Sequence, residues 1–186
     1  MAASSSSSSP RWSYDVFLSF RGEDTRKTIT NHLYEALRRQ GIVVFRDDDE
    51  LERGKAIADV LIKAIEESRS TIVILSQRYA DSKWCLRELA KIVHCKNTLG
   101  QTVLVVFHKI NSFDVISPTG IYENFFIDHE SNIKENFEEV QSWRYAMREV
   151  GGLFGWHVND EYDSLLLLSY TSVSKFSCPL EIEFRT

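Results

Sequence analysis

The stretch "STIVILSQRYADSKWCLREL", residues 70–89, decides the fold class of this chain. Its residues 71–76 are almost wholly apolar, as expected for a strand that is covered on both faces in a parallel sheet. A polar loop follows, and Asp81 or Ser82 can cap a helix whose apolar side chains recur at helical spacing. This order of strand, loop and helix predicts one unit of an α/β protein.

Other segments repeat this order of strand and helix. The same apolar and β-branched pattern predicts further strands over residues 14–20, 42–45, 102–107 and, more briefly, 154–158. After the first strand, apolar residues recur at helical spacing, and Asp24 or Thr25 can cap the helix that they predict. Residues 111–136 are predicted to be irregular, with helical patches. Beyond them Val140, Trp143, Met147 and Val150 fall at helical spacing before a natural end at Gly151.

Alternating strands and helices predict a flavodoxin-like α/β fold, in which a five-stranded parallel sheet has helices on both faces. The first and third strands are neighbours in that order, and ligands bind beyond the carboxyl ends of the strands at this point. The loop "FRGEDTRK", residues 20–27, and the loop "SQRYADSKW", residues 76–84, are therefore expected to share one cleft.

Length and composition favour one domain with short tails. The chain has 186 residues, of which 43% are apolar and 26% charged. We assign residues 1–11 to a disordered Ser-rich leader, 12–159 to the folded domain and 160–186 to a tail of uncertain order. Neither a secretory signal nor a run of about 18 apolar residues that could span a membrane is present in the sequence.

Charge and cysteine content narrow the function classes. A net charge of −5 argues against nucleic acid as a partner, because binding to phosphates requires a basic face. The odd set of Cys85, Cys95 and Cys178 fits reduced thiols, which favours the cytoplasm and leaves nuclear entry open. The five histidines have no pair at metal-ligand spacing, so no metal site is predicted and each histidine is interpreted as a surface or boundary residue.

Trp84 and Glu88 are four residues apart, so on a helix their side chains are neighbours. An aromatic ring can bind a flat heterocycle, and a fixed carboxylate can stabilise the positive ribosyl centre that forms when an N-glycosidic bond breaks. Arg21 and Arg26 on the opposite loop could hold a diphosphate. Such a Trp and Glu pair is common on ordinary helices, and spacing alone leaves both interpretations open.

Three stretches, "YDVFLSFRGEDTRKTITNHLYEALRRQGI", "FRDDDELERGKAI" and "SQRYADSKWCLREL", resemble the TIR domain of plant intracellular immune receptors. The resemblance implies the same flavodoxin-like fold. It also implies a self-associating signalling module that hydrolyses NAD+ or NADP+ to nicotinamide and ribosyl nucleotide signals, with no cofactor beyond this substrate. In full receptors of the family, a nucleotide-binding switch and leucine-rich repeats come after the TIR domain. Because the sequence shows neither of them, a stand-alone TIR protein is expected.

The resemblance also assigns residues. It implies that Glu88, in the motif "WCLREL", is catalytic. The implied substrate-binding residues are Phe20, Arg21, Gly22, Arg26, Ser76, Tyr79 and Trp84, with the loop "DDDELERG", residues 47–54, closing over the substrate.

Self-association is implied at two places. The family's Ser-His pair on the first helix reads Asn31 and His32 here, and a second surface is centred near Gly120. The segment 108–122, "HKINSFDVISPTGIY", departs from the family pattern around that second surface. A non-catalytic adaptor that binds other TIR-containing receptors is therefore the alternative to an enzyme.

Overall fold

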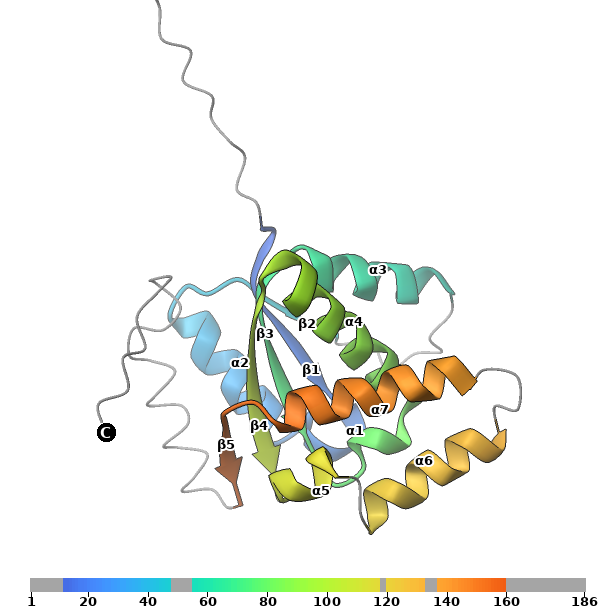
Figure 1. The fold of residues 1–186 in the computed structure, drawn as a ribbon. Coiled ribbons are helices and arrows are strands. Elements are labelled where there is room, and N and C mark those ends of the chain that lie inside the picture. Colours follow the sequence, from blue (N-terminus) through green and yellow to red (C-terminus); the bar gives the residue numbers. More distant parts are fainter. Residues whose placement is uncertain (1–11, 48–54, 118–119, 133–136, 160–186) are drawn as a thin grey trace, which may run out of the picture.

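The computed structural model describes residues 12–47, 55–117, 120–132 and 137–159 and contains one five-stranded sheet of order β2-β1-β3-β4-β5 (Figure 1). All neighbouring strands in it are parallel. The strands are β1 Tyr14–Phe20, β2 Val44–Arg46, β3 Ser68–Leu75, β4 Thr102–His108 and β5 Gly155–Val158. With β1 between β2 and β3, this order confirms the predicted flavodoxin-like sheet. The predicted leader and tail lie outside the described residues.

Strand β3 begins three residues earlier than its apolar run predicts. Ser68 pairs with Tyr14 of β1, and Ser70 pairs with both β1 and β4. The Ser68 hydroxyl donates to the carbonyl oxygen of Ala64, and the Ser70 hydroxyl donates to the carbonyl oxygen of Asp15. Because backbone acceptors satisfy both hydroxyls, polar residues can occupy a buried strand.

The helices are α1 Gly22–Thr25, α2 Ile29–Arg39, α3 Lys55–Glu66, α4 Lys83–Leu99, α5 Ser112–Ile116, α6 Ile121–Asn132 and α7 Phe137–Gly151, with a short 3₁₀ turn, η1, at Tyr79–Asp81. Ser82 caps α4 by accepting from the Cys85 amide, as predicted. The prediction that Asp24 or Thr25 caps the first long helix is wrong, because both lie within α1. The Asp24 carboxylate is engaged by side chains of two loops instead.

The segment 111–136, predicted to be irregular with helical patches, is more regular than expected where the structure describes it, because α5 and α6 lie there. Asn111 caps α5 by accepting from the Phe113 amide. In α6 the side chain of Phe126 is buried but its neighbour Ile127 is 51% exposed. Apolar side chains on both faces obscure the helical pattern, which explains the difference.

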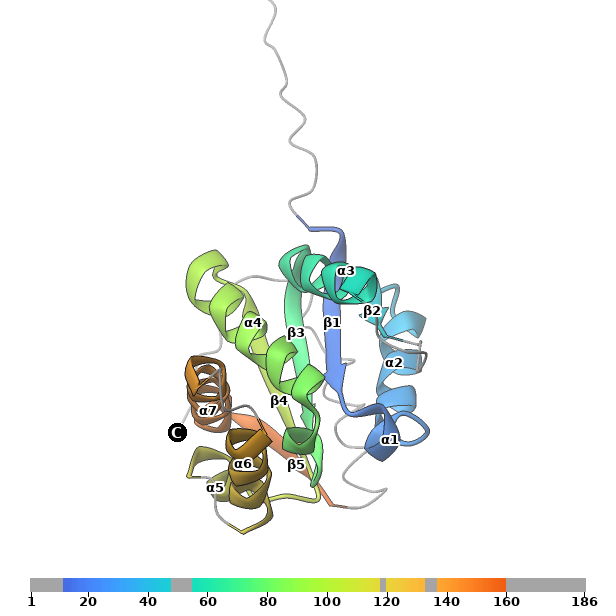
Figure 2. The same cartoon turned by 90° about the vertical axis from the view of Figure 1, so that its right-hand side faces the viewer.

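The sheet separates two buried clusters. Val16, Leu18 and Phe20 of β1 pack with α2 on one face, and Phe17 packs with α3, α4 and α7 on the other. Figures 1 and 2 show α2 on one side of the sheet and these three helices on the opposite side. Because successive side chains of a strand alternate between faces, Ser19 points to the α4 side.

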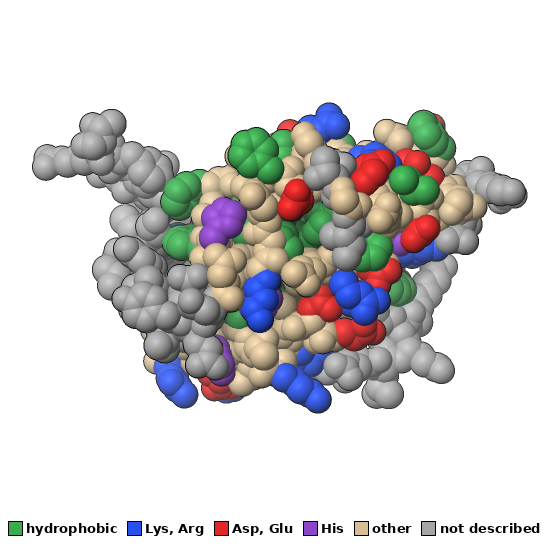
Figure 3. Space-filling model, turned by 90° about the horizontal axis from the view of Figure 1, so that it is seen from below, with side chains coloured by type: hydrophobic (Ala, Val, Ile, Leu, Met, Phe, Trp, Pro, Cys, Tyr) green, Lys and Arg blue, Asp and Glu red, His purple; other side chains and the backbone are tan. Residues whose placement is uncertain are grey.

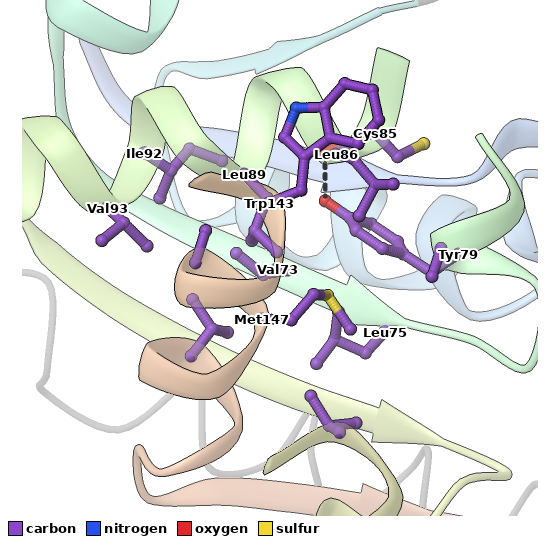
Figure 4. Close-up of a cluster of buried hydrophobic side chains, with 14 of the residues drawn as sticks. Val73, Leu75, Tyr79, Cys85, Leu86, Leu89, Ile92, Val93, Trp143 and Met147 are labelled. Carbon is purple, nitrogen blue, oxygen red and sulfur yellow. Dashed lines mark hydrogen bonds between the residues drawn. The ribbon is translucent and has the colours of Figure 1, made fainter. Parts of the chain in front are cut away.

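Helix α7 fills the larger cluster, as predicted from its spacing: Val140, Trp143, Met147 and Val150 are all buried. Figure 4 shows Trp143 and Met147 beside side chains of α4 and β3. The described thiols, Cys85 and Cys95, are buried, whereas Cys178 lies outside the described residues.

His129 corrects the prediction that all five histidines are surface or boundary residues. It is 6% exposed, its Nε2 lies 2.8 Å from the carbonyl oxygen of Ala80, and its ring meets Trp143 edge-on. A backbone carbonyl within reach of the imidazole lets the residue occupy this buried place.

We expect Gln101→Ala to lower the free energy of unfolding by about 1–3 kcal/mol. The side chain is 3% exposed, and its Nε2 donates to the carbonyl oxygens of Ile65 at 2.8 Å and Ser68 at 2.7 Å. Its loss leaves buried acceptors unpaired where α3 meets β3. Urea denaturation measures the effect, with the exposed Asn97→Ala as control, and equal midpoints for the two variants would contradict it.

Candidate functional site

The loops after β1 and β3 meet at the carboxyl end of the sheet, as the strand order predicts. An Arg21 guanidinium nitrogen lies 3.0 Å from a carboxylate oxygen of Asp81. The Ser76 hydroxyl donates to the Asp24 carboxylate at 2.5 Å. Figure 3 views the molecule from this end and shows acidic and basic side chains intermingled on its surface.

Arg21 joins these loops through carboxylates. Its guanidinium contacts Glu23 at 2.8 Å and Asp24 at 2.9 Å in addition to Asp81, and its side chain is only 11% exposed. Asp24 also accepts from the Arg78 amide at 3.3 Å. Arg21 therefore clamps two loops together and does not present a free cation for a diphosphate.

Arg26 and Gly22 form a second contact between loops. Arg26 donates through Nη1 to the carbonyl oxygen of Asp47 at 2.6 Å, and its guanidinium lies 5.2 Å from the centre of the Phe20 ring. A Cβ added at Gly22 would lie 2.8 Å from Nη2 of Arg26, so glycine allows this approach. Residues 48–54 of the implied closing loop lie outside the described residues.

Glu88 lies on the inner face of α4 and is 6% exposed. Its Oε2 accepts a hydrogen bond of 3.3 Å from the Ser19 hydroxyl. The Ser19 oxygen in turn lies 2.8 Å from the hydroxyl of Tyr79, which also donates to the carbonyl oxygen of Cys85 at 3.2 Å. This buried carboxylate thus stands beside β1 at the point where the strand order reverses.

Burial keeps the Tyr79 hydroxyl protonated. The side chain is fully buried, and this burial raises the pKa of Tyr79 well above its ordinary value of 10, with Cys85 and Glu88 adding to the shift. Loss of its proton would place a second negative charge beside a carboxylate in a site with little water. The phenol therefore acts as a hydrogen-bond donor throughout the ordinary pH range.

Only some of the remaining predicted substrate residues lie near Glu88. Trp84 is half-buried one turn before it on α4, with the Arg87 guanidinium 5.7 Å from its ring centre. Phe20 belongs to the α2 cluster, on the opposite face of the sheet. Ser76 is buried and its hydroxyl donates to Asp24, whereas Tyr79 lies in the core and is linked to Glu88 through Ser19.

Ser19 is the residue of this site that the sequence analysis missed. Its signal is nonetheless in the sequence, because a single hydroxyl interrupts the otherwise apolar run "VFLSF", residues 16–20. The period of two along the strand places it on the face opposite Phe20. Only the packing of α4 on that face reveals that its partner is Glu88.

The implied self-association residues lie at the surface. Asn31 and His32 are exposed on α2, and Asn31 accepts from Arg46 at 3.0 Å. Gly120 is exposed and has a φ of +57°, a left-handed conformation that favours glycine.

A hollow of about 820 Å³ lies beyond the ends of β3, β4 and β5, with Lys109, Asn111 and His157 in its wall, and Glu88 is not among its lining residues.

Across the part of the chain that the structure describes, no group of three His, Cys, Asp or Glu side chains could hold a metal ion. Within the same ranges no helix is long and apolar enough to cross a membrane.

Comparison with known proteins decides the family. The model of the TIR domain family matches residues 13–169. The chain belongs to the TIR domain family. This confirms the resemblance on which the site assignments depend.

Its relatives are plant disease resistance proteins. The TIR chain is 51% identical to TMV resistance protein N of Nicotiana glutinosa over 81% of its own length and 13% of that protein. It is 48% identical to Disease resistance protein RPV1 of Vitis rotundifolia over 87% of its length and 12% of that protein. The chain thus spans about an eighth of each of these relatives.

A solved structure supports the fold. The TIR domains of the activated Roq1 resistosome, which directly recognises the pathogen effector XopQ, match with a TM-score of 0.76 and 41% identity. The match covers 86% of this TIR chain and 99% of the solved chain. The five-stranded sheet and its helices are therefore those of a plant TIR domain.

Proposed function

We propose that this TIR domain is a plant immune signalling module that hydrolyses NAD+ or NADP+ at the bond between nicotinamide and ribose. One observation carries the proposal: the carboxylate of Glu88 is hydrogen-bonded to Ser19 of β1 at the switch point of the sheet. Ligands of such sheets bind beyond the carboxyl ends of the strands at this point.

Cleavage of the bond between nicotinamide and ribose requires a fixed negative charge. Departure of neutral nicotinamide leaves positive charge on the ribosyl carbon, and a carboxylate held in a site with little water stabilises this charge. Water then forms the new bond to that carbon and releases a proton. Trp84, one helical turn from Glu88, offers a ring face to the substrate.

The test is the release of nicotinamide from NAD+ by concentrated or crowded protein, measured for wild type and Glu88→Gln. Turnover by wild type and its loss in the variant would support the proposal. A folded wild-type protein that forms oligomers yet releases no nicotinamide from NAD+ or NADP+ would contradict it.

A non-catalytic adaptor is the second candidate, and the Arg21 clamp favours it. Glu23, Asp24 and Asp81 surround the guanidinium of Arg21, one of the two arginines that were expected to hold a diphosphate. These carboxylates offset the positive charge of Arg21, which disfavours the binding of a diphosphate by this residue. As an adaptor, the domain would dock on other TIR-containing receptors through exposed residues such as Asn31 and His32.

We expect His32→Ala to weaken self-association roughly fivefold or more, because an exposed interface residue that matters contributes above about 1 kcal/mol. Sedimentation over a range of protein concentrations measures the change. His94→Ala, an exposed histidine on α4, is the matched control. Equal association by the two variants would exclude His32 from the interface.

The same variants separate the two candidates. An assembly-dependent enzyme loses nicotinamide release in both His32→Ala and Glu88→Gln. An adaptor loses receptor binding in His32→Ala and keeps it in Glu88→Gln.

A further inference from the structure

Two buried hydroxyls link Glu88 to the protein core. Ser19 and Tyr79 are each 0% exposed, so neither can touch a substrate in this conformation. The distances are 3.3 Å from Ser19 Oγ to Glu88 Oε2 and 2.8 Å from Ser19 Oγ to the Tyr79 hydroxyl. Figure 4 shows the Tyr79 hydroxyl directed at the α4 backbone, where it meets the carbonyl oxygen of Cys85.

The protons of these two hydrogen-bonded hydroxyls can be counted. Each hydroxyl has one O–H to donate and can also accept. The acceptors in reach are the Glu88 carboxylate, the Cys85 carbonyl and the other hydroxyl. When Glu88 is charged, the stronger bond forms if Ser19 donates to it, and Tyr79 then donates to Ser19 or Cys85. A charged Glu88 thereby fixes the direction of the Ser19 hydroxyl.

Packing alone does not require these hydroxyls. Ser19 interrupts an otherwise apolar strand, and a buried hydroxyl costs free energy unless it is hydrogen-bonded. Alanine at this position would keep β1 apolar. The hydroxyl is therefore explained by its partners, one of which is Glu88.

Resting on the proposed hydrolysis, we propose that Ser19 and Tyr79 are positioning residues for Glu88. Their hydroxyl chain holds the carboxylate in its charged form and in one orientation, aimed at the sugar of the dinucleotide. The inference concerns the working of this site and adds two residues that act only through Glu88.

The test compares Ser19→Ala and Tyr79→Phe with wild type in nicotinamide release over roughly pH 5 to 9. For Ser19→Ala we expect kcat to fall roughly tenfold with KM within about twofold, because a hydrogen bond to a charged group is lost. The acid limb of the kcat/KM profile should move to higher pH, since a carboxyl that loses a donor binds a proton more readily. Tyr79→Phe should show the same direction with a smaller change.

Two variants control for simple loss of stability. Ser68→Ala removes the hydroxyl of another fully buried strand serine, which donates to the Ala64 carbonyl. Tyr122→Phe removes a buried phenol hydroxyl that donates to the Ser76 carbonyl. Both should keep the wild-type pH profile. If Ser19→Ala folds poorly by circular dichroism, Tyr79→Phe carries the test alone.

The outcomes distinguish this inference from the proposed function. If Glu88→Gln loses turnover while Ser19→Ala and Tyr79→Phe keep the wild-type kcat and pH profile, the positioning role is overturned and the hydrolase stands. If Glu88→Gln turns over like wild type, or the wild type releases no nicotinamide, the hydrolase fails and this inference fails with it.

Discussion

We expect Glu88→Gln to lower nicotinamide release at least about 100-fold, because it neutralises the group proposed to stabilise transition-state charge. Glutamine keeps the size of the side chain and an oxygen that can accept from Ser19. The fold should therefore survive, and the loss should fall on kcat with little change in KM. Steady-state rates of nicotinamide release over a range of NAD+ concentrations give both quantities.

The matched control for this substitution is Glu66→Gln. Glu66 is an exposed glutamate of α3 whose carboxylate pairs with Lys91 at 2.5 Å. The Glu66→Gln variant should release nicotinamide at the wild-type rate, since exposed ion pairs contribute little to stability. Equal turnover by Glu88→Gln and Glu66→Gln would remove the carboxylate from the reaction.

Trp143→Ala is the substitution with the largest expected effect on stability, a loss of about 3–5 kcal/mol in the free energy of unfolding. The side chain is 1% exposed and is the largest of the fully buried side chains. It lies where α7 packs on α4 and contacts His129 edge-on. Its removal leaves a cavity that neighbouring helices cannot fill.

Tyr145→Ala on the same helix is the control, because Tyr145 is 51% exposed and its removal opens no cavity. Denaturant midpoints at constant slope measure both variants. A loss for Trp143→Ala no larger than that for Tyr145→Ala would show that α7 is not needed to hold α4. The loss of the Trp143 ring should also disturb the position of Trp84, because the Arg87 guanidinium lies 5.7 Å from the centre of the Trp84 ring and 6.0 Å from that of Trp143.

Much of the fold could be predicted because its signals are local. The apolar run of β4 and the spacing of Val140, Trp143 and Met147 in α7 each reflect burial of one short segment. Prediction failed where the buried side chains do not follow a simple pattern of apolar residues on one face of a helix or strand. The side chains of α6 are apolar on both sides, and the start of β3 is polar but is satisfied by backbone acceptors.

The candidate site could be predicted only in part. The helix that carries Glu88 and the meeting of the two loops follow from the order of elements. The role expected of Arg21 did not allow for its three carboxylate partners. A guanidinium looks the same in a sequence whether it faces a phosphate or an aspartate, because its partner is set by folding.

The sequence by itself determined the family, the alternation of strands and helices, and the presence of a carboxylate four residues from an indole. Only the tertiary structure decided what those groups touch. Ser19 and Glu88 are 69 positions apart, and Arg21 and Asp81 are 60 apart. Periodicity records which side of an element is buried, whereas a polar partner depends on which distant segment packs against that side.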